Sequence, residues 1–408
     1  MISPDEAWIR IDHQIEVLEA VRTPRRDALG GVLAESLVAT GNVPAHDVSA
    51  MDGFALTGAP DPAVPLRIAG TIAAGDAPGA NLDTEAVMRI MTGAPVPIGA
   101  DRVIPVEMST VTAAGVLFSS EGLSGDHIRR GGEIVVAGQE LLPAGSLLTP
   151  GSLSLIATHG HAEVAVHRRP SLAVLATGDE VVSPDRNPAP GQLRDSHTDF
   201  LLAAGRQLGL ATESLGIAAD QTDSIRRKVE LGLPYDVLLV CGGVSMGEFD
   251  LVEGVLAELG CQVLFDAVAI QPGKPIVAAR HESGWVFGLP GNPASVMVGF
   301  WLFVRPLLRR LQGLADGFWN GALEGVLTAE LPAAKGRDRF LSAQILFAAG
   351  QPQVQPLWSK GSHDVAAFGQ GTGLVRIPAN SAASKPGDSC QFLPLIDWPT
   401  PWLDHLAG

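Results

Sequence analysis

The sequence DVLLVCGGVSMGEFD, residues 236–250, contains the pattern on which the fold depends. An apolar run, Asp236–Val240, is followed by a glycine-rich loop, Cys241–Asp250, and then by a helical stretch, Asp250–Leu259. A short continuous apolar run between turn residues is typical of a strand that is buried on both faces of a parallel sheet. The stretch therefore predicts one repeat of strand, loop and helix in a doubly wound α/β domain.

The same alternation extends in both directions, over residues 171–312. The predicted strands are Leu172–Ala176, Glu213–Ala218, Asp236–Val240, Gln262–Ala269 and Trp285–Gly288. The predicted helices are Asp195–Leu208, Gln221–Leu231, Asp250–Leu259 and a closing helix, Pro293–Leu311. This order predicts a parallel sheet with right-handed crossovers and helices on both faces.

The flanking regions differ in composition. Residues 4–38 predict helices, because Ile11, Ile15, Leu18 and Val21 recur at helical spacing and a second short helix is expected over Arg25–Leu37. Residues 39–125 are dense in glycine and proline between short apolar runs, which is typical of a β-rich module. Short strands return over residues 320–396 and predict a small β barrel.

Residues 126–168, with a helix over about 150–159, are expected to pack back on the N-terminal helices. The expected domains are therefore a discontinuous linker domain (1–40 plus 126–168), an inserted β-rich domain (41–125), an α/β domain (169–314) and a C-terminal β barrel (315–408).

Composition excludes several classes of partner. The 408 residues have a formal net charge of −16, which argues against nucleic acid, because binding a phosphate backbone needs a basic face. No apolar run is long enough to span a membrane, and the N-terminus lacks the pattern of a secretory signal. Three cysteines without paired spacing indicate reduced thiols, so a cytoplasmic location is expected.

Three loops predict a ligand site, since ligands of parallel sheets bind beyond the carboxyl ends of the strands. The loops are Ala176–Glu180, Cys241–Asp250 and Gly288–Ser295. In the second loop Gly242 and Gly243 leave backbone amides accessible, and Ser245 adds a hydroxyl. In the third loop, Gly291 permits close approach, Asn292 suits an N-cap and Pro293 suits the first helical position. Any one loop could be a plain tight turn, but three at one edge favour a site for a phosphorylated small molecule.

Charged side chains accompany these loops. The carboxylates Asp179, Glu180, Asp220 and Asp250 beside a phosphate site suggest a bridging divalent cation, commonly Mg²⁺. Helix capping is the alternative reading, and it suits Asp250 especially well. Lys274, in the rigid turn QPGKP, could neutralise an oxyanion or could be an ordinary surface lysine.

The β-rich region has two further signals. Asp52 lies in SAMDGFA (49–55) and Thr92 lies in RIMTGAPVP (89–97), each next to a glycine in an apolar frame, although a plain turn is an alternative for both. The histidines do not form a zinc set, and the sequence has no nucleophile elbow, Walker A loop or Rossmann fingerprint.

Taken together, the motifs resemble the MoeA/gephyrin E-domain family, the molybdopterin molybdenumtransferases. They are SAMDGFAL (49–56), RIMTGAPVP (89–97), IRRGGE (128–133), LATGDEV (175–181), CGGVSMGEFD (241–250), IQPGKP (270–275) and GLPGNPAS (288–295). The resemblance covers essentially the whole chain. It implies an elongated protein of four domains, in which the central α/β domain is similar to MogA-type proteins and the C-terminal domain is a β barrel.

The resemblance also implies an activity, the insertion of molybdate into adenylylated molybdopterin with Mg²⁺, which yields molybdenum cofactor and AMP. It implies a homodimer with a shared site, to which one subunit supplies Asp52 and Thr92. The other subunit supplies Glu180, Asp220, Asp250, Lys274 and Ser362, with Glu180 and Asp250 as metal ligands. The groups expected to bind the substrate are Thr177, Gly178, Asp179, Gly242, Gly243, Ser245, Pro290, Gly291, Asn292 and Ser295. Molybdoenzyme apoproteins are possible further partners.

Some positions depart from the family pattern. An expected aspartate is Ile134, an expected lysine is Ala267, an expected arginine is Ser342 (with Arg337 and Arg339 nearby), and an asparagine is His197. These departures leave a second hypothesis open, a non-catalytic protein that binds or delivers the cofactor. A third hypothesis is a nucleotide amidohydrolase of the competence-damage type, whose N-terminal domain resembles residues 171–312.

Overall fold

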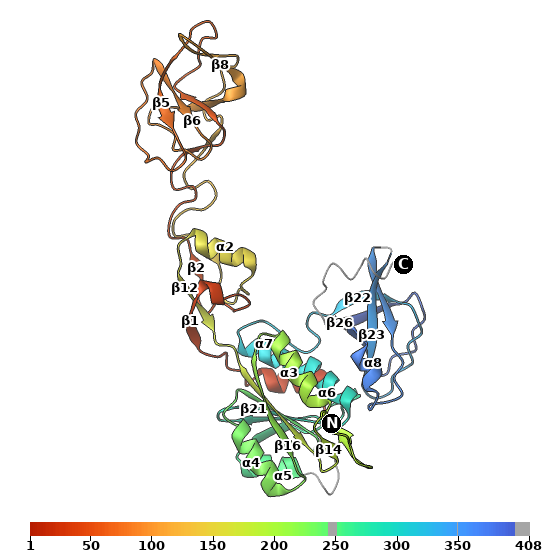
Figure 1. Cartoon of the computed structure of the whole chain (residues 1–408). Helices are drawn as coiled ribbons and strands as arrows, with labels where there is room; N and C mark the ends of the chain where they lie inside the picture. The colour runs from red at the N-terminus through yellow and green to blue at the C-terminus, as the bar shows by residue number, and fades with distance from the viewer. Residues whose placement is uncertain (244–250, 349, 396–408) are drawn as a thin grey trace. The chain divides into compact units, whose positions relative to one another are not determined.

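The computed structural model describes residues 1–243, 251–348 and 350–395 (Figure 1). The chain divides into two compact units. The first, called here the α/β–barrel unit, comprises Met1–Arg22, Gly30–Ala34 and Ala165–Gly408. The second, called the β-rich unit, comprises Thr23–Leu29 and Glu35–Val164.

A six-stranded sheet organises the α/β–barrel unit. Its strands, in spatial order, are β16 (Ala211–Ala218), β13 (Ser171–Thr177), β17 (Val237–Cys241), β21 (Gly284–Leu289), β20 (Val277–His281) and β18 (Gln262–Phe265). The first four strands are parallel, as the alternation predicted. The expectation of a wholly parallel sheet is wrong, because β20 runs antiparallel to both of its neighbours. β20 and β21 are joined by only two residues, and so short a connection permits only an antiparallel pair.

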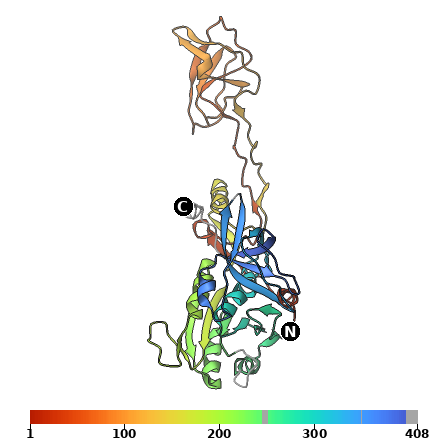
Figure 2. The same ribbon diagram turned by 90° about the vertical axis from the view of Figure 1, so that its right-hand side faces the viewer.

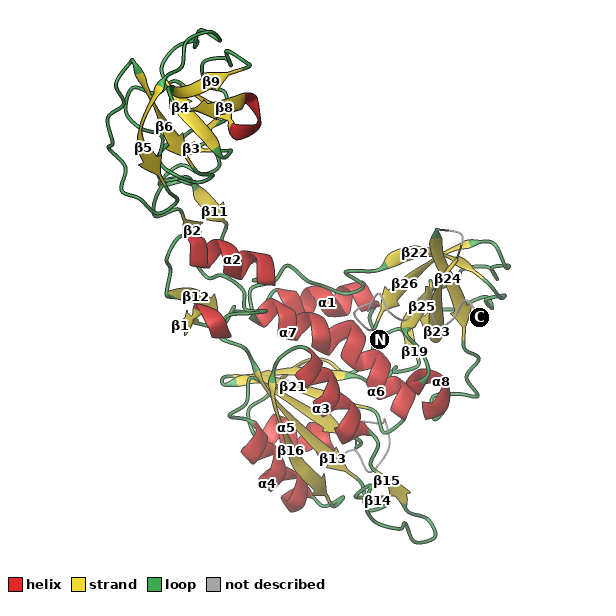
Figure 3. Cartoon of the chain, turned by 45° about the horizontal axis from the view of Figure 1, so that its top comes forward, coloured by secondary structure: helices red, strands yellow, loops and turns green. Residues whose placement is uncertain are grey.

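Helices cover both faces of this sheet (Figure 3). Alternate residues of β13 separate the two cores: Leu172 and Val174 pack with α3 (His197–Gln207), α6 (Pro293–Gly299) and α7 (Arg305–Leu311). On the other face, Ala173 and Leu175 pack with α4 (Thr222–Gly232) and α5 (Leu251–Glu258). The doubly wound fold is therefore confirmed. The predicted closing helix is also present, with a π-helical turn, Phe300–Val304, between α6 and α7.

The C-terminal part forms a closed barrel. Its ring is β23 (Asp338–Ala348), β24 (Gln351–Pro356), β22 (Leu323–Leu327), β26 (Ser389–Pro394) and β25 (Gly373–Ile377), and the pairing of β23 with β25 closes it. A short helix, α8 (Val365–Gly369), was not predicted. A strand from the α/β part, β19 (Ile270–Gln271), pairs in parallel with β23 and brings the turn after it to the start of that strand.

The N-terminal prediction is partly wrong. The first helix, α1, covers only Pro4–Asp12, and the chain is already in strand β1 at Ala20–Pro24, so Val21 is not helical. The second predicted helix is reduced to one 3₁₀ turn, Arg25–Asp27. Gly30 adopts a φ of +70°, the left-handed conformation that commonly ends a helix. The apolar residues that follow at helical spacing, up to Leu37, therefore do not form a helix.

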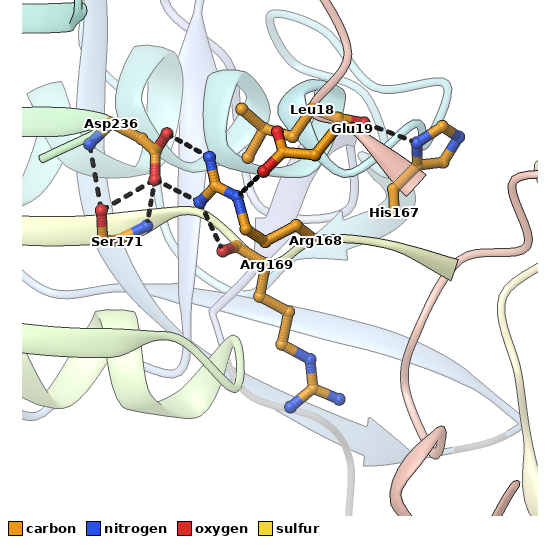
Figure 4. A network of polar contacts seen from close by, with 7 residues as sticks. All are labelled: Leu18, Glu19, His167, Arg168, Arg169, Ser171 and Asp236. Atoms are coloured by element: carbon orange, nitrogen blue, oxygen red, sulfur yellow. Dashed lines mark hydrogen bonds and ion pairs between the residues drawn. The ribbon is translucent and has the colours of Figure 1, made fainter. Parts of the chain in front are cut away.

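Arg168 fastens the N-terminal segment to the base of the sheet (Figure 4). Its guanidinium donates to both carboxylate oxygens of Asp236 at 2.8 Å and to Glu19 Oε1 at 2.6 Å. Burial opposes the ionisation of Asp236, but the hydrogen bonds from Arg168 and Ser171 outweigh it, so the pKa of Asp236 is lowered. The ionised network thus holds residues before β1 against the sheet that carries the candidate site.

Within the β-rich unit, two segments far apart in the sequence lie side by side (Figures 1 and 2). The segments pair through β2 (Leu37–Val38) with β11 (Glu140–Leu142), and through β3 (Val48–Ser49) with β10 (Ile128–Arg129). Between them lie a four-stranded sheet and a hairpin, formed by β5 (Arg67–Ile72), β6 (Ala86–Ile90), β4 (Gly53–Leu56), β7 (Arg102–Pro105), β8 (Ser109–Thr112) and β9 (Gly115–Phe118). The unit also holds the helix α2 (Pro150–Thr158), capped by Thr149.

Candidate functional site

The three loops predicted to form a site meet at one edge of the sheet. The backbone amide of Gly242 donates to the carbonyl of Leu289 (3.0 Å), and Thr177 Oγ1 donates to the carbonyl of Cys241 (3.3 Å). A Cβ at Gly242 would stand 2.8 Å from the carbonyl oxygen of Thr177, and one at Gly291 would stand 4.0 Å from Gly242 Cα. The ends of β13, β17 and β21 are therefore in mutual contact.

Gly242 and Gly243 are required by this contact. Their φ angles are +95° and +63°, a conformation that favours glycine, and a side chain on either residue would collide with Thr177 or Val252. The loop therefore keeps its backbone bare at the sheet edge. The rest of this loop, with the predicted site residues Ser245 and Asp250, lies outside the described residues.

Asp179, Glu180 and Asp220 give this edge a negative charge. Each of the two aspartates accepts from the other's amide: Asp220 N donates to Asp179 Oδ1 (3.0 Å), and Asp179 N donates to Asp220 Oδ2 (3.4 Å). Glu180 turns back toward the edge, because its Oε2 is 2.7 Å from where a Cβ on Gly178 would be. These residues, with Gly242 and Gly243, are called here the acidic sheet edge.

The carboxylates of the acidic sheet edge lie close enough to affect one another's ionisation. Burial raises the pKa of Asp220, and the neighbouring charges of Asp179 and Glu180 raise it further, against the effect of its backbone hydrogen bond. A cation near these neighbouring carboxylates would favour the ionised form of Asp220. Over residues 1–243, 251–348 and 350–395, no three histidine, cysteine or acidic side chains converge closely enough to form a ready metal site.

A cavity of about 310 Å³ is lined by side chains of the opposite charge. It is called here the cationic pocket, and it is lined by the turn Gln271–Pro275, by Pro290, Asn292 and Ser295, by Arg337, Arg339, Phe340 and Leu341, and by Ser359, Gly361, Ser362 and Phe368. Lys274 is half-buried in this lining. The pocket thus places three cationic side chains beside serine hydroxyls.

Arg337 and Arg339 line this pocket, whereas the sequence analysis named them only as neighbours of Ser342 and assigned them no role. Asp338, which stands between them, is buried and accepts from Arg376 Nε at 2.7 Å, so it does not neutralise the pocket. Arg339 Nε is buried with no hydrogen-bond partner among the described residues. The signal in the sequence is the alternation RDR at 337–339, whose position beside Lys274 depends on the pairing of β19 with β23.

The departure at Ser342 does not remove a cation from this pocket. Ser342 is only 1% exposed, and a Cβ added to Gly371 would come within 1.8 Å of its hydroxyl, so a longer side chain has no room there. Arg339 lines the cavity three residues earlier. The expected loss of positive charge is therefore not seen at this position.

Ser362 and the start of α6 join the two parts of the α/β–barrel unit. The carbonyl of Ser362 accepts from Ala294 N at 3.1 Å, and the buried Ser295 donates its amide to the carbonyl of Asn292. Asn292 is at the N-cap position but makes no side-chain capping bond. Its amide group is therefore not used by the helix and lines the cationic pocket.

Asp52 and Thr92 form a pair in the β-rich unit. Thr92 donates to Asp52 Oδ1 from its amide (2.7 Å) and from its hydroxyl (2.8 Å). These hydrogen bonds lower the pKa of Asp52, so the exposed carboxylate is ionised at neutral pH. Ile134, the departure in the same unit, is an exposed apolar side chain.

The fold defines a class, the doubly wound α/β proteins, whose ligands commonly bind beyond the carboxyl ends of the strands, where these two charged regions lie. Family models match nearly the whole chain: the MoeA N-terminal region (domains I and II) over residues 2–160, a probable molybdopterin-binding domain over 173–310, and the MoeA C-terminal region (domain IV) over 324–395. The chain therefore belongs to the MoeA family, and the resemblance read from its motifs is confirmed.

Individual relatives agree. Molybdopterin molybdenumtransferase 2 of Mycobacterium tuberculosis is 34% identical over 93% of this chain and 98% of its own length. Molybdopterin molybdenumtransferase of Bacillus subtilis is 32% identical over 96% and 94%, respectively. The crystal structure of a molybdopterin biosynthesis MoeA protein from Pyrococcus horikoshii superimposes with a TM-score of 0.84 at 28% identity, covering 98% of this chain and 100% of that one. In the part of the chain that the structure describes, no helix combines the length and apolarity needed to cross a bilayer.

Proposed function

We propose that this chain is a molybdenumtransferase that inserts molybdate into adenylylated molybdopterin and releases AMP and molybdenum cofactor. The observation that carries the proposal is the pairing of the cationic pocket with the acidic sheet edge at the start of α6. The reaction needs one site for a tetrahedral dianion and another for a phosphoanhydride. The relatives named molybdopterin molybdenumtransferase support this substrate class.

Molybdate is assigned to the cationic pocket. In a chain of net charge −16, a dianion needs local positive charge, and Lys274, Arg337 and Arg339 supply it. Guanidinium groups suit this task, since they present paired donors to the oxygens of an oxyanion. The unpartnered Nε of Arg339 and the hydroxyls of Ser359 and Ser362 are the donors proposed to hold it.

The phosphoanhydride is assigned to the acidic sheet edge. Gly242 and Gly243 let the phosphates approach the backbone closely, together with the loop Pro290–Ser295 and the dipole of the helical run that follows it. Thr177 and Gly178 complete this backbone surface. Mg²⁺ is proposed to be held by Glu180 and by Asp250 of the glycine-rich loop, beside the carboxylates of Asp179 and Asp220. When bound, the ion would neutralise phosphate charge.

The residues of the chain then act by position and charge. Water attacks the adenylate phosphorus and gives up a proton to solvent, the phosphoanhydride P–O bond breaks, and the pterin phosphate leaves with the electron pair of that bond, which frees AMP. If a molybdate oxygen attacks instead, water must then cleave the adenylyl–molybdate bond to free AMP. In either case the two dithiolene sulfurs replace oxygens of molybdate, which leave as water. Lys274 and the backbone amides stabilise the negative charge that develops on the phosphate oxygens. No covalent bond to the protein is needed.

The proposal includes a homodimer in the cytoplasm. Asp52 and Thr92 of a second copy would complete the site at the acidic sheet edge, and molybdoenzyme apoproteins would take up the product. The ionised, exposed state of Asp52 supports a role with a cation or a polar substrate. Burial raises the pKa of the thiols, to about 11 for Cys390, which fits unreactive cysteines in a reducing compartment. Light scattering at micromolar concentration is expected to give twice the 42.5 kDa chain mass, and a monomer would contradict this part of the proposal.

The alternative, a non-catalytic cofactor carrier, is not favoured, because the cationic pocket keeps its cations despite Ser342. The separating experiment mixes purified protein, Mg²⁺ and adenylylated molybdopterin with and without molybdate. The enzyme is expected to release AMP in a molybdate-dependent way. Tight binding of the nucleotide without AMP release above background would favour the carrier.

A further inference from the structure

A groove with an exposed tryptophan lies beside the cationic pocket, on the barrel. Its volume is about 520 Å³, and it is lined by Leu357, Trp358, Lys360, His363, Val365 and Gln370, among others. Trp358 is 59% exposed and Val365 is 44% exposed. It is called here the aromatic groove. Trp358 therefore presents an exposed indole face at the wall of the groove, on which a flat ring can stack.

One loop forms a wall of both cavities. Between β24 and α8, Ser359 and Ser362 line the cationic pocket, whereas Trp358, Lys360 and His363 line the aromatic groove. Consecutive Cα atoms are about 3.8 Å apart, so a small molecule seated in the pocket is within reach of the groove. The opposite wall of the pocket is the α6 loop, with Pro290, Asn292 and Ser295, which leads to the acidic sheet edge.

The shape of this loop is set by Asp364. Its carboxylate accepts from Lys360 N at 2.9 Å and from Ala367 N at 3.1 Å, which caps α8. With Asp364 used in this way, the polar groups left to meet a ligand in the groove are the ammonium of Lys360, the imidazole of His363 and the amide of Gln370. The groove therefore offers a flat apolar face with donors and an acceptor along its rim.

The inference about the groove rests on the proposed function. The chemistry of molybdopterin fits the order aromatic groove, cationic pocket, acidic sheet edge. Molybdopterin carries its dithiolene between a flat pterin ring system and a phosphate arm. If the dithiolene meets molybdate in the cationic pocket and the phosphate arm points to the acidic sheet edge, the ring system must leave past the other wall. We propose that the aromatic groove is the pterin subsite, with the ring stacked on Trp358 and its polar edge facing Lys360, His363 and Gln370.

A protein partner is the competing occupant. Docking patches on protein surfaces usually present a contiguous apolar area of several hundred Å². In the groove, by contrast, Trp358 and Val365 are the exposed large apolar side chains, and the rim is polar. A single flat heterocycle matches this composition better than a peptide segment does.

The test is the binding of neopterin, a pterin without dithiolene or phosphate, to the full chain by calorimetry. Stacking on an aromatic side chain is commonly worth about 10-fold or more in affinity, so Trp358→Ala is expected to weaken the Kd by at least that factor. Trp358→Phe, which keeps a flat ring, is expected to stay within about 3-fold of the wild type. The matched control is Phe347→Ala, which removes an exposed aromatic side chain on β23, away from the groove lining.

An unchanged Kd in Trp358→Ala, or no neopterin binding by the wild type at millimolar concentration, would overturn the assignment. The neopterin test of the subsite can fail or succeed independently of the AMP-release test of the proposed function. Molybdate-dependent AMP release with equal neopterin affinity in Trp358→Ala would keep the function and remove the subsite. Neopterin binding that depends on Trp358, without AMP release, would keep the pterin subsite and contradict the proposed function.

Discussion

The acidic sheet edge and the cationic pocket adjoin the same loop before α6, yet they are built in different ways. The edge consists of residues that directly follow three neighbouring strands, β16, β13 and β17. The pocket collects side chains from four segments, between residues 271 and 368, that meet only in the folded chain. The edge repels anions through its carboxylates unless a cation is bound, whereas the pocket attracts them. In the function proposed above, this difference in charge separates a dianion in the pocket from a phosphoanhydride at the edge.

The largest expected effect comes from removing positive charge from the pocket. Arg339→Gln is expected to lower molybdate-dependent AMP release by about 100-fold, because one oxyanion donor commonly contributes that much. The variant should need a higher molybdate concentration for half-maximal AMP release, while its affinity for AMP is unchanged. Lys335→Gln, an exposed lysine outside the pocket lining, is the control. A wild-type response of Arg339→Gln to molybdate would break the comparison.

The next effect concerns the bare backbone of the acidic sheet edge. Gly242→Ala is expected to destabilise the protein by about 2 kcal/mol, since it combines a left-handed φ with a Cβ 2.8 Å from a carbonyl oxygen. Gly254→Ala, in α5, has open space around its Cβ and should be neutral or slightly stabilising. Urea unfolding of both variants measures the difference. Equal stabilities would show that the edge does not need glycine at 242.

The smallest effect is a pH dependence at Asp220. Its pKa is raised in the folded protein, so its protonated form stabilises the fold at low pH, and that stabilisation is lost as pH rises through the folded pKa. Asp220→Asn is therefore expected to be more stable than the wild type at pH 7, by less than about 1 kcal/mol after solvent screening, and equal to it near pH 3. Thermal melts over this pH range, with and without Mg²⁺, provide the measurement.

If Mg²⁺ binds the acidic sheet edge, it should raise the melting temperature of the wild type at pH 7 more than that of Asp220→Asn. A wild type that is more stable than Asp220→Asn at pH 7 without Mg²⁺ would mean that the three carboxylates do not repel one another.

The two regions also differ in how far the sequence predicts them. The edge could be predicted because apolar runs such as Val237–Cys241 mark strands, and parallel strands bring their following loops together. The pocket could not, because Arg339 reaches Lys274 only through the pairing of Gln271 with Arg339, across 68 residues of sequence. No local pattern encodes such a pairing.

The errors in the fold have a similar origin. The predicted helix over Arg25–Leu37 failed at Gly30, whose backbone conformation overrides the spacing of the apolar residues. The antiparallel strand β20 (Val277–His281) was missed because its apolar part, Val277–Ala279, is only three residues long and ends in Arg280 and His281. Asp52 and Thr92 were recognised from their motifs, and the structure adds that they are hydrogen-bonded to each other.

The central claim is that the cationic pocket, and not the acidic sheet edge, takes the molybdenum oxyanion. A crystal of the full chain soaked in molybdate, with data collected at the molybdenum absorption edge, tests it directly. We expect one anomalous peak among Lys274, Arg337 and Arg339, which disappears in Arg339→Gln. A peak among the carboxylates of Asp179, Glu180 and Asp220, or a peak in the pocket that is unchanged in Arg339→Gln, would contradict this account.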